Sequence, residues 1–228
     1  MGSTLIETPS LDGGNKYESP VVYIHRGRTS FRMETSPKIG KEVIEGCKAG
    51  NRKAFEQIVL FYQKRVFNIA YRMLGNRDEA KELAQEVFIS VFESIRELRE
   101  EAKFDGWLKQ IILNHCRNRW KYLKRRQYYN TESMDDPIET EEGEVPKSFH
   151  DPSDTPDILY DKKMVQEWIQ KGLLRLKEDQ RELIILRDFQ GLSYEEIGRL
   201  LILPEGTIKS KLHRARMDLK EILEKSVH

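Results

Sequence analysis

The chain has 228 residues, a length that suits either one large domain or two small ones. Charged residues make up 34% of it and hydrophobic residues 38%, which favours small helical domains with much solvated surface over large buried sheets. No apolar run approaches the roughly 20 residues that span a bilayer, and Met1 is not followed by a signal-peptide core. We therefore expect a cytoplasmic protein without direct membrane insertion.

The two cysteines, Cys47 and Cys116, are far apart and show no Cys-x-x-Cys or His-x-x-His spacing, so the sequence predicts neither a disulfide nor a zinc site. His115 adjoins Cys116, but adjacent side chains on a helix diverge. The sequence also contains no nucleophile motif and no phosphate-binding glycine-rich loop. We expect no metal, no cofactor, no catalytic residue and no enzymatic activity.

The net charge of +1 hides blocks of opposite sign. From Arg117 to Arg126 six of ten residues are Lys or Arg, whereas Glu132 to Asp157 holds ten acidic residues against the single Lys147. Basic modules therefore flank an acidic connector.

Residues 1–37 contain several Pro and Gly residues without a sustained hydrophobic period, and only the run from Val21 to Ile24 has the composition of a strand. We interpret them as an N-terminal tail. Plain disorder and a regulatory arm both fit, because Arg26, Arg28 and Arg32 have the chemistry to contact phosphate or a protein partner.

Residues 38–127 show apolar residues at helical spacing and form the first predicted domain. One stripe runs through Phe55, Ile58, Val59, Tyr62, Val66, Ile69, Ala70 and Met73, and a second through Leu83, Ala84, Val87, Phe88, Val91, Phe92, Ile95 and Leu98. Between them Gly75 suits the end of one helix, Asn76 the cap of the next, and Glu79 the capping-box position. We expect the two helices to pack together.

A third helix is predicted over about 106–126, with Leu108, Ile111, Ile112, Cys116 and Leu123 on its apolar side. Its other side carries Asn114, Arg117, Lys121 and Lys124 at steps of three, four and three, extended by Arg125 and Arg126. This nearly cationic face favours contact with phosphates.

Residues 128–157 form the acidic linker, and 158–228 the second small domain. Thr155 and Pro156 suit the start of a helix that runs through Trp168 to about Leu174. Three further helical stretches are predicted over 178–188, 193–201 and about 204–223. The last two, joined by a turn of about three residues, are typical of a helix-turn-helix.

On the final helix Ile208, Leu212, Ala215 and Leu219 mark the buried side and leave Ser210, His213 and Met217 exposed, with Lys209, Arg214 and Lys220 beside them. We expect Lys209 and Arg214 to reach phosphates or guanine edges and Ser210 to approach a base.

The segments GLSYEEIG and PEGTIKSKLHRAR resemble region 4 of extracytoplasmic-function sigma factors of bacterial RNA polymerase. EAKELAQEVF (79–88) resembles the polymerase-binding helix of region 2, and FDGWLKQIILN (104–114) its promoter-melting segment. The resemblance implies an all-α fold, with a region 2 bundle and a region 4 helix-turn-helix joined by a flexible linker. Lys81, Asn118 and Lys177 depart from the usual pattern.

The resemblance also implies a role for each matched position. Core polymerase would contact Glu79, Glu82, Gln85 and Glu86, minus-ten DNA would contact Arg99, Lys103, Asn114, Arg117, Lys121 and Lys124, and minus-thirty-five DNA would contact Thr207, Lys209, Ser210, Lys211, His213 and Arg214. Trp107 is a strand-opening candidate, but core packing is the stronger expectation. The loop from Arg99 to Asp105 is the better candidate for capturing an unstacked base.

The implied partners are the β′ clamp and β flap of core polymerase, promoter DNA and an anti-sigma factor. The acidic linker fits two interpretations, a solvated tether and an RNA mimic inside the polymerase channels. Three alternatives to a sigma factor remain at this point: a helix-turn-helix regulator acting without polymerase, an enzyme on nucleic acid, and an adaptor that does not touch DNA.

Overall fold

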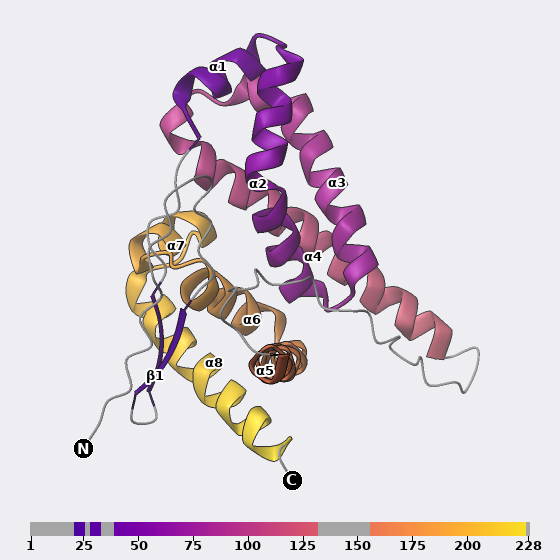
Figure 1. The fold of residues 1–228 in the computed structure, drawn as a ribbon, viewed down its shortest axis with the longest axis vertical. Helices are drawn as coiled ribbons and strands as arrows, with labels where there is room; N and C mark the ends of the chain where they lie inside the picture. Colours follow the sequence, from indigo (N-terminus) through magenta and orange to yellow (C-terminus); the bar gives the residue numbers. More distant parts are fainter. Residues whose placement is uncertain (1–20, 26–27, 33–38, 132–155, 227–228) are drawn as a thin grey trace.

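Helices form most of the described chain in the computed structural model (Figure 1). The structure describes residues 21–25, 28–32, 39–131 and 156–226, with side chains described for 39–126 and 164–226. The predicted all-α class with two helical bundles is confirmed. The acidic part of the predicted linker, 132–155, lies outside the described residues.

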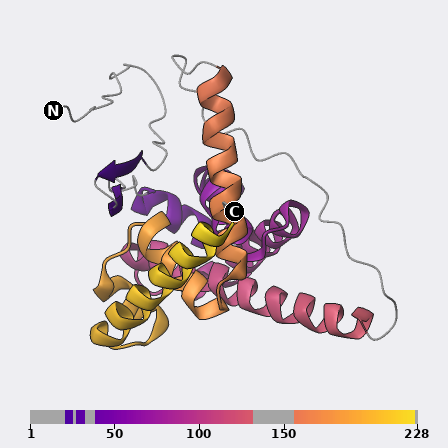
Figure 2. The same ribbon diagram turned by 90° about the horizontal axis from the view of Figure 1, so that it is seen from below.

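The first bundle contains α1 (Lys41–Lys48), α2 (Arg52–Leu74), α3 (Arg77–Ser94), the short 3-10 turns η1 (Ile95–Glu97) and η2 (Glu101–Lys103), and α4 (Phe104–Thr131). The predicted caps of α2 and α3 are present. Gly75 ends α2 in the left-handed region (φ 78°), and the Asn76 side chain accepts hydrogen bonds from the first turn of α3. α4 begins two residues earlier than expected and extends past the bundle, where its end projects from the body (Figure 2).

The second bundle contains α5 (Pro156–Arg175), α6 (Glu178–Ile184), the π-helical turn η3 (Ile185–Phe189), α7 (Tyr194–Leu201) and α8 (Glu205–Lys225). The predicted capping box is present, because Ser193 Oγ accepts from Glu196 N at 3.1 Å and Ser193 N donates to Glu196 Oε2 at 2.7 Å. The single helix expected over 178–188 is instead α6 followed by η3.

The turn between α7 and α8 contains a residue in an unfavourable backbone conformation. Ile202 ends α7 at φ 56° and ψ 48°, and it is 90% exposed. A β-branched residue is strained in the left-handed region, where glycine or asparagine is usual. Ile202 therefore costs stability without contributing to the core.

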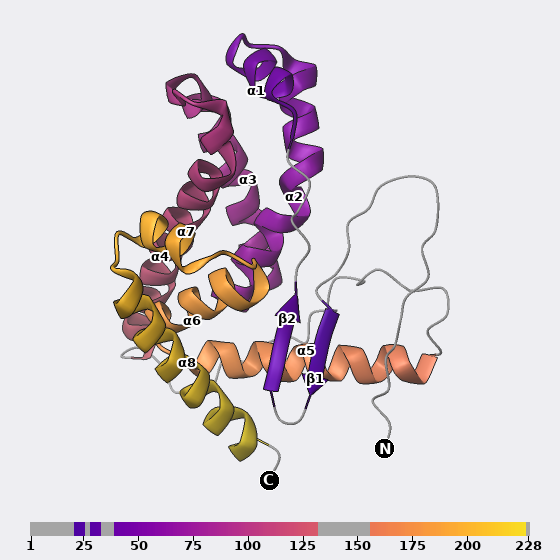
Figure 3. The same ribbon diagram turned by 90° about the vertical axis from the view of Figure 1, so that its left-hand side faces the viewer.

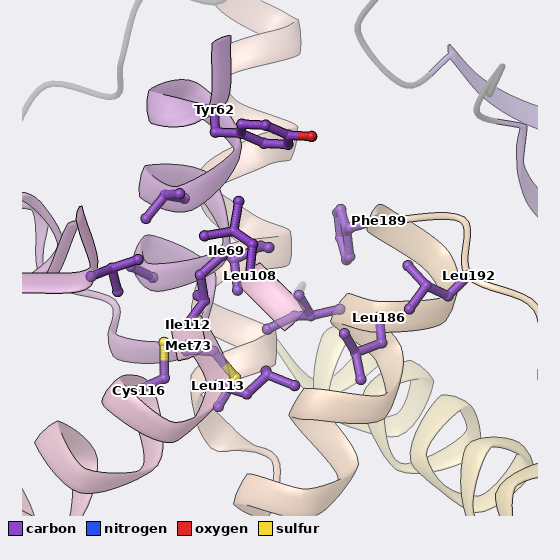
Figure 4. Close-up of a cluster of buried hydrophobic side chains, with 14 of the residues drawn as sticks. Tyr62, Ile69, Met73, Leu108, Ile112, Leu113, Cys116, Leu186, Phe189 and Leu192 are labelled. Carbon is purple, nitrogen blue, oxygen red and sulfur yellow. The ribbon is translucent and has the colours of Figure 1, made fainter. Parts of the chain in front are cut away.

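The two bundles pack directly on each other, which the sequence did not predict. Figure 4 shows Ile69 and Met73 of α2 and Leu108, Ile112 and Cys116 of α4 beside Leu186, Phe189 and Leu192 of the second bundle. Arg72 of α2 adds a polar contact, its guanidinium 3.8 Å from the centre of the Phe189 ring. One continuous core joins the bundles.

A two-stranded antiparallel hairpin precedes the helices, formed by β1 (Val21–His25) and β2 (Arg28–Arg32), with Val21 paired to Arg32. The sequence indicated only the first strand. The hairpin lies on the side of α5 and α8 (Figure 3), and β2 contacts η3. No helix among the described residues is long and apolar enough to cross a membrane.

Candidate nucleic-acid interface

α8 presents its predicted exposed side to solvent. Ile208, Leu212 and Ala215 are buried inside the second bundle, and Ser210, Arg214 and Met217 therefore lie on the exposed side of the helix. Thr207 lies on the same side, one turn before Ser210, whose hydroxyl donates to the Thr207 carbonyl at 3.0 Å. The predicted buried and exposed faces of the final helix are both observed.

The cations around this face differ in their contacts. Lys209 forms an ion pair with Glu205 at 2.7 Å, a hydrogen bond that raises the pKa of Lys209. Lys211 is turned toward α6, where its ammonium lies 2.8 Å from Asp179 Oδ2. Because Lys211 lies between Ile208 and Ala215 on the helix surface, it flanks the buried side of α8 and stands apart from the exposed face.

α4 holds four of the six residues predicted for minus-ten DNA. Asn114, Lys121 and Lys124 are exposed, and the Lys124 ammonium lies 5.1 Å from the centre of the Trp120 ring. Asn114 and Lys124 lie about 15 Å apart along the helix at 1.5 Å per residue. That length spans several base steps of 3.4 Å.

Arg117 is the member of this set whose guanidinium is occupied by another part of the chain. Its Nη2 lies 2.6 Å from Glu182 Oε1 and its Nε 3.4 Å from Glu182 Oε2. Glu182 belongs to α6, so the pair joins the two bundles. Burial raises the pKa of Glu182, and the charge of Arg117 opposes that shift.

The loop before α4 is anchored to α2. Tyr62 Oη donates to Asp105 Oδ1 at 2.5 Å, and Arg65 Nη1 lies 3.3 Å from the same oxygen. Arg99 and Lys103 remain exposed, although Lys103 pairs with Glu100 at 2.6 Å. A hollow of about 130 Å³ adjoins the loop, lined by Ile39, Lys41, Ile44, Tyr62, Glu101, Ala102, Phe104 and Asp105.

Trp107 is partly buried and packs against the core, its ring centre 5.7 Å from that of the buried Phe104. This position agrees with the expected core role and gives no support to a strand-opening role. Arg99 and Lys103, the two cations of this region that were predicted to contact minus-ten DNA, both have exposed side chains.

Three of the four predicted polymerase-binding residues form ion pairs with the same arginine. Arg119 of α4 reaches across to α3, with Nη1 2.5 Å from Glu79 and 3.2 Å from Glu82, and Nη2 2.5 Å from Glu86. Glu79 thus makes an ion pair at the position where the sequence predicted a capping box. Gln85 on the same helix is exposed.

The same face of α3 continues into apolar residues that the sequence analysis did not assign to it. Ile89 and Phe92 follow Gln85 at steps of four and three and are 58% and 55% exposed. Phe92 was expected to be buried, but it lies on the surface with its ring edge toward Phe55 at 5.0 Å between centres. Ile89 is an apolar residue within the polar stripe of α3, and this feature of the sequence could have indicated that the face continues into apolar residues.

Arg181 was also missed, because its role depends on helix ends that are distant in sequence. It is 2% exposed and donates to the backbone carbonyls of Leu173 (2.9 Å), Leu174 (2.9 Å) and Leu176 (3.1 Å) near the end of α5, and to that of Met73 (2.5 Å) near the end of α2. Burial lowers the pKa of this guanidinium. Arg181 satisfies carbonyls that the two helices leave without a partner.

These features define the class of the protein. The second bundle contains a helix-turn-helix with an exposed polar and cationic face, and the first bundle carries a basic helix, α4, and an acidic face on α3. The chain is a two-domain transcription factor built to bind both DNA and a protein partner.

Comparison with known proteins defines the family. The family described as Sigma-70 region 2 matches residues 58–126, and Sigma-70, region 4 matches residues 166–219. The ECF RNA polymerase sigma factor SigW of Bacillus subtilis is 32% identical over 183 residues, which are 80% of this chain and 96% of that protein. The ECF RNA polymerase sigma-E factor of Escherichia coli (strain K12) is 30% identical over 174 residues, 76% of this chain and 88% of the relative.

A solved structure is also similar, that of the sigma factor RpoE of Bartonella quintana in complex with the anti-sigma factor NepR. Its TM-score is 0.56 at 25% identity, over 75% of this chain and 98% of that one. The chain belongs to the ECF family of RNA polymerase sigma factors. It binds core RNA polymerase and promoter DNA and directs promoter-specific initiation, as a recognition subunit and not an enzyme.

Proposed function

We propose that the two bundles divide promoter recognition, with residues 38–127 acting at the polymerase clamp and the minus-ten element and 158–228 acting at the minus-thirty-five element. The observation that carries this proposal is the exposed face of α8 in its helix-turn-helix setting. Thr207, Ser210 and Arg214 share one side of the helix near its first turns, the part that enters the major groove in this motif.

At the minus-thirty-five element Arg214 and Lys209 contact phosphates or guanine edges, and Ser210 approaches a base. His213 flanks the same face. Lys211, which is held by Asp179 in this conformation, contributes a phosphate contact after leaving that exposed ion pair.

At the minus-ten element Asn114, Arg117, Lys121 and Lys124 hold the non-template strand along α4. Arg99 and Lys103 flank the loop that receives an unstacked base, and the base binds in the adjoining hollow. Extrusion of a base costs a few kcal/mol, which stacking and hydrogen bonds to the base edges offset.

Core polymerase docks on α3, through Glu79, Glu82, Gln85 and Glu86 and through the exposed Ile89 and Phe92. An apolar centre with a charged border is the usual composition of a protein interface. The β′ clamp is the partner for this face and the β flap the partner for the second bundle.

The protein works in the cytoplasm, where an anti-sigma factor restrains it by covering these surfaces. The Bartonella relative, solved with its anti-sigma factor, supports that partner. Residues 128–157 tether the two bundles, either as a solvated linker or as an acidic segment in the polymerase channels. Residues 1–37 precede the domains as a tail that includes the hairpin.

A gel shift on promoter fragments with and without core polymerase tests the division of roles. We expect specific complexes only with polymerase, since two tethered weak sites combine their affinities. Lys209→Glu with Arg214→Glu should abolish dependence on the minus-thirty-five sequence. Lys171→Glu with Lys225→Glu, an equal charge change at exposed positions outside the proposed sites, should not. Specific binding to a palindromic site without polymerase would overturn the proposal.

A further inference from the structure

An ion pair at the start of α8 joins a carboxylate to one of the proposed base-reading cations. Glu205 is the first residue of α8, and its Oε1 lies 2.7 Å from the ammonium of Lys209, one turn further on. Both side chains are more than half exposed, Glu205 at 54% and Lys209 at 56%. The pair therefore lies on the surface of α8, at the end of the helix that enters the major groove in this motif.

The Lys209 ammonium has a second contact that keeps it beside Glu205. It lies 5.4 Å from the centre of the ring of Tyr194, which is the first residue of α7. The face of an aromatic ring attracts a cation, so this contact and the ion pair restrict the ammonium together. Glu205 and Lys209 consequently present a hydrogen-bond acceptor and a donor side by side.

The first turn of α8 has little bulk that would keep a base pair away from this ion pair. Gly206 follows Glu205 and is exposed, and a Cβ built on it would meet open space within 4 Å. Pro204, which precedes Glu205, is exposed too. Backbone without a side chain admits a close approach of DNA.

A carboxylate that enters a DNA groove requires a compensating contact. The duplex carries one negative charge per about 1.7 Å of its axis, so the carboxylate of Glu205 weakens binding unless it accepts a hydrogen bond from a base. In the major groove a Glu side chain accepts from N4 of cytosine, while a Lys side chain donates to O6 and N7 of guanine. These groups belong to the same C·G base pair.

The order of donors and acceptors distinguishes this base pair from the others. Guanine presents N7 and O6 next to each other, and the amino group of its paired cytosine follows. In an A·T pair the amino group lies between two separate acceptors, N7 of adenine and O4 of thymine, so one cation finds no adjacent pair of acceptors. The ion pair of Glu205 and Lys209 is therefore complementary to a C·G pair.

We propose that Glu205 is a specificity-determining residue that selects a cytosine in the minus-thirty-five element, with Lys209 bound to the guanine of the same base pair. The Glu205 carboxylate accepts from cytosine N4, and the Lys209 ammonium donates to guanine O6 and N7. The inference rests on the proposed role of α8 at this element. It adds an acidic residue to that role, whose contribution is selectivity because a carboxylate does not attach to phosphates.

Competition binding measures this selectivity in the complex of the full chain with core polymerase. In a promoter fragment that the wild-type complex binds, each base pair of the minus-thirty-five element is replaced in turn by the other three. We expect replacement of one particular C·G pair to weaken wild-type binding by about tenfold, as for the loss of a single base contact. Glu205→Gln should lose the preference for cytosine at that position and favour adenine, because an amide pairs with N6 and N7 of adenine.

Glu221→Gln is the matched control. Glu221 lies on the same helix and forms an ion pair of the same spacing and the same length with Lys225, at 2.7 Å, but at the other end of α8. This variant removes an equal charge outside the proposed sites. It should keep the wild-type preference at every position of the element.

Two further variants separate the outcomes. If the carboxylate only repels phosphates, Glu205→Ala and Glu205→Gln would bind all sequences more tightly and keep the preference for the C·G pair, and that result would overturn the inference. A wild-type complex without a C·G preference at any position of the element would overturn it as well. Arg214→Ala tests the role of α8 separately, because it should weaken binding to the element whether or not Glu205 reads a base. If Arg214→Ala leaves the dependence on the minus-thirty-five sequence unchanged, the proposed role of α8 fails, and the inference fails with it.

Discussion

Replacing Arg181 by methionine tests how far one buried side chain stabilises both bundles. The guanidinium donates to the carbonyl of Met73 at the end of α2 and to those of Leu173, Leu174 and Leu176 at the end of α5. Methionine fills a similar volume but donates no hydrogen bond, so four carbonyls lose their donor.

The expected loss follows from these four bonds. A hydrogen bond to a charged group contributes about 1.5–3 kcal/mol, which sets an upper bound of about 6–12 kcal/mol. The variant no longer has to desolvate a buried guanidinium, and that offsets part of the loss. We expect a decrease of about 3–5 kcal/mol in the free energy of unfolding.

Urea denaturation followed by circular dichroism measures this decrease. With a slope near 2.5 kcal/mol/M the midpoint should fall by about 1.5 M. Arg175→Met is the matched control, because Arg175 is exposed and its recorded bond is to Ser226 Oγ at 3.2 Å; it should change stability by less than about 0.5 kcal/mol. A loss below about 1 kcal/mol for Arg181→Met would refute the reasoning.

Three further variants or probes test separate features. Burial raises the pKa of Cys116 to about 12 from its ordinary 9.0, so its thiol should resist iodoacetamide at pH 8 until the chain unfolds. Because the folded state favours the protonated thiol, the contribution of Cys116 to the free energy of unfolding is complete below about pH 9 and is lost as the pH rises toward 12. Ile202→Asn should raise the free energy of unfolding by about 0.5–1 kcal/mol, because asparagine tolerates the left-handed conformation. A lower midpoint temperature of thermal denaturation in this variant would contradict the strain at Ile202. Arg119→Gln should steepen the salt dependence of binding to core polymerase, since it leaves three carboxylates without their shared cation; an unchanged slope would show that Arg119 does not act on the docking face.

Local rules predicted much of the fold. Gly75, Asn76 and Ser193 act on backbone groups within one turn, so their roles follow from nearby residues alone. The helical period likewise identified both faces of α8, although Lys211 turned toward α6 because of an acidic partner 32 residues away.

Long-range pairs set the limit of such prediction. Arg117 and Glu182 are 65 residues apart, and Arg181 reaches a carbonyl 108 residues away. No periodic pattern encodes such contacts, and each residue alone fits a solvated helix face. The prediction that Phe92 is buried was wrong for another reason: an apolar residue at the edge of a wide stripe is buried or exposed according to where the next helix lies.

Transcription in vitro tests the central claim most directly. Purified chain and core polymerase would be incubated with a pool of genomic promoter fragments from the source organism, and transcript starts would be mapped. We predict defined starts that require both components and that weaken by at least about tenfold with Lys209→Glu and Arg214→Glu, given about 1–3 kcal/mol for each base contact. Starts that are the same without the chain, or that are indifferent to this double substitution, would contradict the account.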